Sequence, residues 1–188
     1  MSSRDIWSQL GNLQIRDVLA SLLSARLLAD EADEPLYVCS PFLTDFPLFD
    51  NGLGQFQALF TKRPKFGEQS EIRFSQVLIE VSERVPVRLI GVPGPNADAF
   101  LRSTITSSNL KISGRHASDL HHEKGLLCRA FYLEGSMNFT YSGVYKNGEK
   151  ISVYTPDSDE GRKKIGSALL QFDRLWNTLQ HRQIPRTQ

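Results

Sequence analysis

Residues 121–138 read HHEKGLLCRAFYLEGSMN, and this stretch decides how the rest of the chain is interpreted. It contains two apolar runs, Glu123–Cys128 and Phe131–Leu133, which are close enough to pair as a β-hairpin. Apolar runs elsewhere predict further strands at Leu36–Ser40, Pro86–Val92, Leu110–Ser113 and Ile151–Tyr154. The predicted strands therefore cluster in the second half of the chain.

Helical patterns occupy much of the remaining sequence. Apolar residues at helical spacings, or a helix-capping residue, predict helices at Leu13–Ala29, Gly54–Phe60, Ser70–Arg84, Asn96–Thr106 and Asp159–Leu179. The segment Phe42–Gly54 is rich in turn-forming residues and is expected to be a loop. This order favours an α/β fold, an α-β-α sandwich with a mixed, largely parallel sheet. Because the sequence has no repeat and no linker, we expect residues 1–188 to form one domain.

Composition narrows the class of protein. Of the 188 residues, 40% are hydrophobic and 23% are charged, which is typical of a soluble globular domain. Lysine and arginine together number 22 against 21 acidic residues, so a wholly basic nucleic-acid coat is excluded, although a local basic groove is not. The sequence contains no apolar run long enough for a membrane span and no signal-peptide layout at its start. Cys39 and Cys128 lie inside apolar runs without metal-ligand spacing, which predicts buried thiols and a cytoplasmic protein.

Four polar side chains gather at the ends of the predicted hairpin. If Glu123–Leu127 is a strand, its period of two places His122 and Lys124 on one face. The neighbouring strand then delivers Ser136 and Asn138 to the same edge. An imidazole, an ammonium, a hydroxyl and a carboxamide suit a phosphate, because they supply a nucleophile or proton carrier, a positive charge and hydrogen-bond donors. The set has no cluster of cysteines or carboxylates for a metal ion, and we expect neither a metal nor another cofactor.

His-x-Lys followed by Gly-Ser-x-Asn resembles the pattern of the phospholipase D superfamily, here at residues 122–124 and 135–138. Eleven residues after Asn138 stands Glu149, where the single-motif nuclease branch has the carboxylate that orients the catalytic imidazole. Such a carboxylate fixes the tautomer of the ring and makes its other nitrogen a better nucleophile. The sequence departs from the family pattern at Arg129, where the fuller motif has a structural aspartate.

The resemblance implies a metal-independent phosphodiesterase that works through a phosphohistidine. In this family two motifs face each other across a two-fold axis, so a chain with one motif implies a homodimer. The roles implied are His122 as nucleophile or general acid, Lys124 and Asn138 as phosphate ligands, Ser136 as a supporting phosphate contact, and Glu149 as the residue that orients His122. Together, residues 40–47 and 135–143 also resemble a narrower group, the small phospholipase-D-like proteins of bacterial DNA-modification and restriction clusters, including 7-deazaguanine systems.

We therefore expect a DNA nuclease in a bacterial defence or restriction system, with nucleic acid, a second copy and other defence proteins as partners. Arg115, Lys146 and Lys150 flank the motif and are candidate nucleic-acid contacts. Trp7 and Trp176 are expected in the core or at an interface rather than as base-stacking residues.

Two alternatives stay open. The first is a non-catalytic nucleic-acid-binding or scaffold subunit of a defence complex, which the near-zero net charge and Arg129 favour. The second is a hydrolase of phospholipids or other phosphodiesters. Against the phospholipid substrate stands the lack of an amphipathic helix with a basic face, and we expect no membrane partner.

Overall fold

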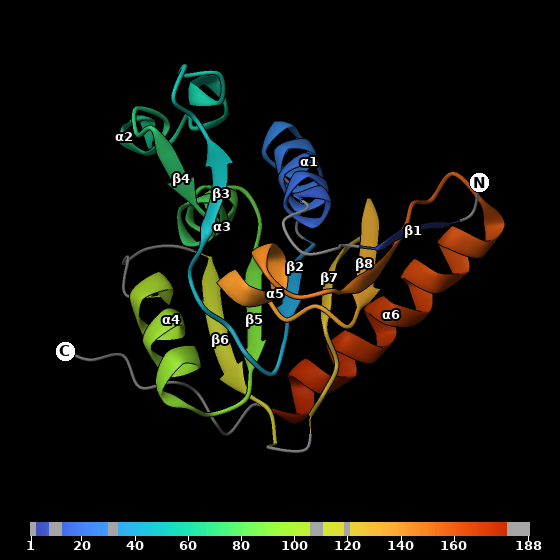
Figure 1. Ribbon diagram of the computed structural model, residues 1–188. Coiled ribbons are helices and arrows are strands. Elements are labelled where there is room, and N and C mark those ends of the chain that lie inside the picture. Colours follow the sequence, from blue (N-terminus) through green and yellow to red (C-terminus); the bar gives the residue numbers. More distant parts are fainter. Residues whose placement is uncertain (1–2, 8–12, 30–33, 106–110, 119–120, 180–188) are drawn as a thin grey trace.

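The computed structural model describes residues 3–7, 13–29, 34–105, 111–118 and 121–179. Its centre is a seven-stranded sheet with the order β1-β9-β8-β7-β2-β5-β6 (Figure 1). The strands of this sheet are β1 (Ser3–Trp7), β2 (Leu36–Cys39), β5 (Val87–Gly91), β6 (Ile112–His116), β7 (Gly125–Cys128), β8 (Phe131–Gly135) and β9 (Lys150–Tyr154). A separate two-stranded ribbon joins β3 (Pro47–Asp50) to β4 (Glu71–Arg73).

The sheet is mixed, as the sequence predicts. β2, β5 and β6 are parallel neighbours, whereas β2–β7, β7–β8, β8–β9 and β9–β1 pair in antiparallel fashion. It follows that β7 and β9 run against the direction shared by the other five strands. The carboxyl ends of those five strands and the amino ends of β7 and β9 therefore meet at one edge, which is the lower edge of the sheet in Figure 1.

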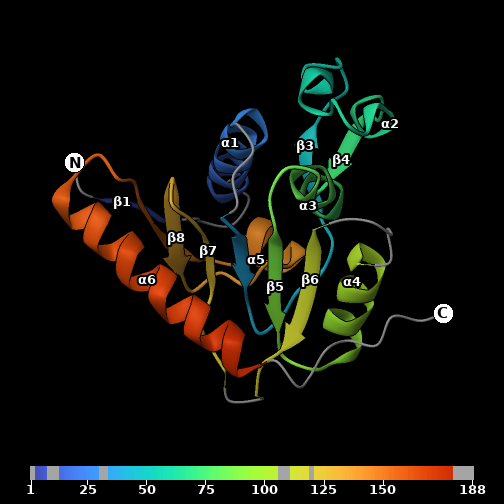
Figure 2. The ribbon, with the colours of Figure 1, turned by 180° about the vertical axis from the view of Figure 1, so that it is seen from behind.

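Helices cover both faces of the sheet and complete the predicted α-β-α sandwich (Figure 2). One face packs against α6 alone, and the other forms a larger core with α1, α3, α4 and α5. The helices are α1 (Gln14–Leu28), the 3-10 helix η1 (Gln57–Leu59), α2 (Pro64–Gly67), α3 (Phe74–Ser82), α4 (Pro95–Ile105), α5 (Tyr141–Tyr145) and α6 (Asp159–Thr178). None of these helices is long and apolar enough to cross a membrane. Whether residues 1–188 form one domain stays a prediction.

Helix α6 shows how the sequence sets this packing. The Ser158 hydroxyl caps its first turn by accepting a hydrogen bond from the amide of Gly161 at 3.0 Å. Ile165, Phe172 and Trp176 then recur at helical spacing and are buried against the sheet. The amphipathic pattern predicted for Asp159–Leu179 is thus confirmed, and it determines which face of α6 packs against the sheet.

Several predicted elements differ from the structure. The predicted loop Phe42–Gly54 contains strand β3, and the predicted helix Ser70–Arg84 begins with strand β4, because these two short segments pair with each other. The predicted helix Gly54–Phe60 is reduced to one 3-10 turn. The buried side chain of Asn51 holds this region as a loop, accepting from the amide of Phe56 and donating to two backbone carbonyls.

The first strand and the fifth helix were not predicted at all. Strand β1 pairs with β9, and Trp7 at its end is 65% exposed, so Trp7 is not part of the core, and its expected place at an interface stays a prediction. Trp176 is buried against the sheet as expected. The cysteines Cys39 and Cys128 are buried free thiols, so the prediction of buried thiols is confirmed.

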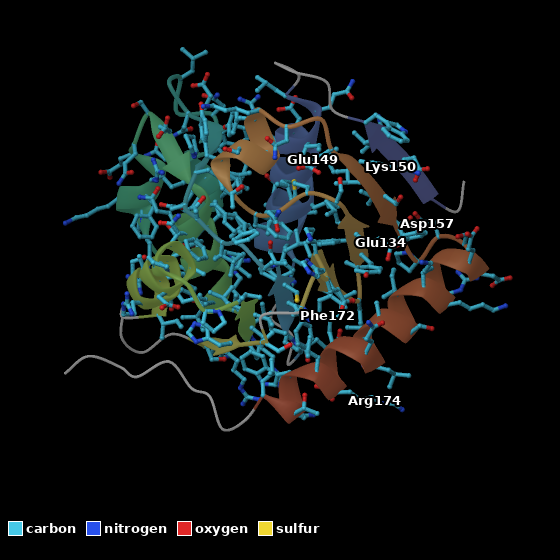
Figure 3. The ribbon with its side chains drawn as sticks, turned by 60° about the horizontal axis from the view of Figure 1, so that its bottom comes forward. Glu134, Glu149, Lys150, Asp157, Phe172 and Arg174 are labelled. Carbon is cyan, nitrogen blue, oxygen red and sulfur yellow. The ribbon has the colours of Figure 1, made fainter. Side chains whose placement is uncertain are left out.

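Phe172 links α6 to the sheet, and its loss should destabilise the whole fold. Its ring is fully buried and meets the rings of Tyr37 and Tyr132 edge-on, at 5.7 and 6.1 Å between centroids (Figure 3). We predict that Phe172→Ala lowers the free energy of unfolding by about 3–5 kcal/mol, as measured by urea denaturation. The matched control Leu170→Ala, on the exposed side of α6, should change it by less than about 0.5 kcal/mol. Equal effects would mean that α6 does not pack as described.

Candidate active site

The predicted site residues lie at the edge where the five strands end and β7 and β9 begin. Residues 121–124 lead into β7, residues 136–138 leave β8, and residues 149–150 lead into β9. Because β7, β8 and β9 are consecutive neighbours in the sheet, these three segments lie next to one another. Figure 3 turns this edge toward the viewer and labels Glu149 and Lys150 at the start of β9 and Glu134 on β8.

The segment that carries His122 is held by contacts on both sides of it. The Cys39 sulfur and His121 Nε2 lie 3.0 Å apart, which ties the segment to the end of β2. Glu123 accepts two hydrogen bonds from Gln171 of α6, at 3.1 and 3.2 Å. The side chain of His122 is exposed, so the flanking anchors leave this imidazole facing solvent.

The prediction that His122 and Lys124 share a strand face is wrong, because the strand begins at Gly125, two residues after the predicted start at Glu123. Gly125 pairs with Cys39 on one side and Glu134 on the other, and both pairings with β7 end there. Residues 121–124 have no ladder partner among the described residues. Instead Lys124 Nζ donates to the carbonyl of His122 at 2.7 Å, and this bond closes the segment on itself.

On the β8 side, Ser136 is the centre of a polar cluster. Its hydroxyl donates to a carboxylate oxygen of Glu149 at 2.5 Å and accepts from the amide of Lys150 at 3.1 Å. Asn147 donates to the second oxygen of Glu149 at 3.2 Å. Gly135 makes the close approach possible, because a Cβ at this position would meet the carbonyl oxygen of Lys150 at 2.2 Å.

A hollow of about 440 Å³ opens between these segments. It brings together four of the predicted residues, namely His122, Lys124, Ser136 and Lys150. Asn138 instead lines an adjacent hollow of about 410 Å³, together with Phe42 and Tyr141. The Asn138 side-chain oxygen accepts from the hydroxyl of Ser40 at 3.1 Å, which fixes the amide at the end of β2. The carboxylates of Glu123 and Glu134 line the same hollow as His122, where they accept hydrogen bonds from Gln171 and Lys164 of α6. The imidazole, the cations and the hydroxyl that face this opening can bind a phosphate and transfer a proton.

The remaining flanking residues occupy different places. Lys146 directly follows α5, and Lys150 is the first residue of β9 and lines the hollow. Arg115 lies on β6, three strands away from β7, where its guanidinium packs 4.0 Å from the ring centroid of Trp176. Arg129 stands at the far end of β7, about 13 Å along the strand, and pairs with Glu34 at 2.6 Å. The departure from the family motif therefore lies away from the site.

Burial sets the protonation of the two groups that anchor the segment. Burial, followed by the charges of Lys124 and His122, lowers the pKa of His121 below its usual 6.5. Burial also raises the pKa of the Cys39 thiol, with a smaller contribution from Glu123. Both shifts favour the neutral forms, a thiol on Cys39 and an uncharged imidazole on His121. These two groups can form a hydrogen bond across the 3.0 Å contact. Among the described residues, no three His, Cys, Asp or Glu side chains are grouped so that they could hold a metal ion.

Sequence reasoning missed Ser40, Cys39 and Gln171 as supports of the site. All three act through contacts between segments far apart in the chain, and no local pattern shows such contacts. Trp7 at the end of β1 was also missed as an exposed residue beside the site. Its ring centroid lies 5.1 Å from Lys150 Nζ.

The fold and the site define an α/β sandwich with a polar cluster at one edge of its sheet. No protein-family model matches the sequence, and no curated protein matches it. Among solved structures, the chain is similar to Nuc from Salmonella typhimurium, a phospholipase D family member. The TM-score is 0.57 and the sequence identity 18%, over 94% of both chains.

Two larger proteins are also similar. Phosphatidylserine synthase from Haemophilus influenzae matches with a TM-score of 0.53 and 14% identity, over 92% of this chain and 38% of that chain. TrmBL2, an archaeal chromatin protein whose structure shows a mode of DNA binding, matches with a TM-score of 0.51 and 10% identity, over 95% of this chain and 53% of that chain. The chain therefore has a phospholipase D-like fold, as the motif predicted.

The pKa of His121 should lie below 6.5, and this shift should make the free energy of unfolding depend on pH. Because the folded state disfavours the imidazolium, the unfolded chain binds more protons between the two pKa values, and stability rises with pH across that window. Imidazole resonances in NMR spectra, assigned with His121→Gln, give the pKa directly. In the variant, the rise in urea stability between about pH 5 and 7 should become smaller. A His121 pKa at or above 6.5 would contradict the described environment.

Proposed function

We propose that the protein is a metal-independent phosphodiesterase that cleaves DNA through a phosphohistidine at a homodimer interface. The observation that carries this proposal is the shared hollow, in which His122, Lys124 and Ser136 face one opening of a phospholipase D-like fold. An exposed imidazole beside an ammonium and a hydroxyl has the composition needed to bind and attack a phosphodiester.

In the first step, a ring nitrogen of His122 attacks phosphorus. The P–N bond forms while the P–O bond to the leaving oxygen breaks, and His122 of the partner subunit gives that oxygen its proton. Lys124 and Asn138 bind the non-bridging phosphate oxygens, and Ser136 supports them. In the second step, water gives a proton to His122 of the partner subunit, attacks phosphorus and breaks the P–N bond, which releases a phosphate monoester.

Glu149 serves as the residue that orients His122. Its carboxylate is held by Ser136 and Asn147, so its position is fixed relative to the end of β8. A fixed carboxylate stabilises the imidazolium that forms when His122 takes up a proton. This assignment makes Ser136 a link between the phosphate-binding residues and the orienting carboxylate.

DNA is the proposed substrate, and a bacterial defence or restriction system is the proposed setting. A chromatin protein whose structure shows a mode of DNA binding is among the similar folds and supports a nucleic-acid substrate. The defence role rests on the resemblance of residues 40–47 and 135–143 to proteins of DNA-modification and restriction clusters.

Cleavage should survive excess EDTA, because the proposed nucleophile and cations belong to the protein. In the presence of EDTA, His122→Ala should abolish cleavage of labelled DNA, while circular dichroism shows an intact fold. The neighbouring change His121→Gln is the matched control. It should slow the reaction and not abolish it, because His121 contacts Cys39 and does not line the hollow. Loss of cleavage on chelation, restored by magnesium, would refute the mechanism.

A site shared between two subunits predicts a particular result for mixed dimers. When equal amounts of wild-type and His122→Ala chains exchange subunits completely, about a quarter of the dimers carry two wild-type chains. Activity relative to the same total amount of wild-type protein should therefore fall to about a quarter. Exchange is verified first by mixing tagged and untagged chains. A value near one half after complete exchange would show that each chain has its own site.

A further inference from the structure

Exposed aromatic rings lie near each of the two hollows that contain the predicted site residues. Near the first hollow, Trp7 at the end of β1 is 65% exposed, although most large apolar side chains of the described chain are buried. Near the second, Phe42 is 63% and Tyr141 45% exposed, and both line the hollow that contains Asn138. These rings contribute little to the core, so the fold alone gives no reason for their size.

Near each hollow, a ring is also paired with a lysine. Lys150 Nζ lies 5.1 Å from the ring centroid of Trp7, and Lys150 itself lines the hollow with His122 and Lys124. Lys146 Nζ lies 5.4 Å from the ring centroid of Tyr141. Trp7 and Lys150 are register partners on β1 and β9, so the strand pairing sets the first pair.

Further contacts hold one member of each ring–lysine pair in place. Asp5 on β1 forms an ion pair with Lys150 at 3.0 Å, which holds the ammonium beside the strand that carries Trp7. Tyr141 stacks on Tyr145 within α5, with centroids 4.9 Å apart and planes 16° from parallel. Rings and cations held in place in the free protein lose little conformational freedom when a ligand binds.

We propose that Trp7 with Lys150, and Tyr141 with Lys146, form a binding surface for single-stranded nucleic acid that runs through the phosphate site. A nucleotide offers a phosphate for the lysine and a base for the ring, so alternating cations and aromatic rings match its chemistry. Bases in a duplex are already stacked and present only their edges, so an exposed ring gains nothing from them. The surface therefore selects unpaired strands, and this substrate class rests on the proposed function for the identity of the phosphate site.

Binding to unpaired and paired DNA tests this surface without any need for turnover. In a His122→Ala background, fluorescence anisotropy measures affinity for an oligothymidylate of roughly 20 nucleotides and for a hairpin duplex with the same number of phosphates. Adding Trp7→Ala should weaken binding of the oligothymidylate about tenfold, the loss expected for one stacked base. Binding of the duplex should change less than about twofold, and Trp7→Phe should retain most of the affinity for the single strand.

The matched control is Leu170→Ala, which removes an equally exposed apolar side chain from α6 and should leave both affinities unchanged. Equal losses for the single strand and the duplex, or no loss for either, would overturn the proposal. So would Trp7-dependent binding to vesicles of phosphatidylglycerol, which would assign the surface to lipid. A change in oligomeric state on Trp7→Ala, measured by light scattering, would assign it to a second copy.

The binding experiment can fail or succeed independently of the cleavage experiment that tests the proposed function. If the single change His122→Ala leaves cleavage intact, the proposed chemistry fails, while a selective loss of single-strand binding in Trp7→Ala still supports the surface. If cleavage depends on His122 but Trp7 has no effect on binding, the chemistry stands and the surface is refuted.

Discussion

The close packing at Gly125 is the constraint on which the rest of the site depends. Strand β7 begins here, between β2 and β8, and a Cβ at this position would lie 2.9 Å from the ring of Phe172 and 3.1 Å from that of Tyr132. Only glycine lets the hairpin and α6 approach this closely. Because the backbone is fixed at Gly125, the preceding four residues leave the sheet at a defined point.

The positions of the other site residues are set by the ends of the neighbouring strands. The His122 segment is tied to β2 through Cys39 and to α6 through Gln171. The Gly135–Ser136 segment is tied to β9 through the backbone of Lys150. Each polar side chain therefore belongs to a rigid element on at least one side. The proposed phosphoryl chemistry requires such rigidity, since small displacements of a nucleophile are costly in rate.

The sequence predicts the parts of this structure that depend on local patterns. The periodicity of α1 and α6, the hairpin, and the positions of Lys124 and Ser136 near one edge can all be read from residue spacing. Strands β1, β3 and β4 could not be predicted, because each is short and pairs with a partner that no local pattern indicates. The exposure of Trp7 follows from that pairing and was missed for the same reason. The Cys39–His121 contact joins residues 82 positions apart, and no motif connects them.

The central claim is that His122 becomes covalently bound to the substrate during turnover. The direct measurement is rapid mixing of enzyme with a short single-stranded oligonucleotide, quenching at alkaline pH to preserve a P–N bond, and peptide mass spectrometry. The account predicts a nucleotide adduct on His122 that forms within the first turnover, decays as product appears, and is absent in His122→Asn. Turnover at the wild-type rate with an adduct on another residue, or in the His122→Asn variant, would contradict it.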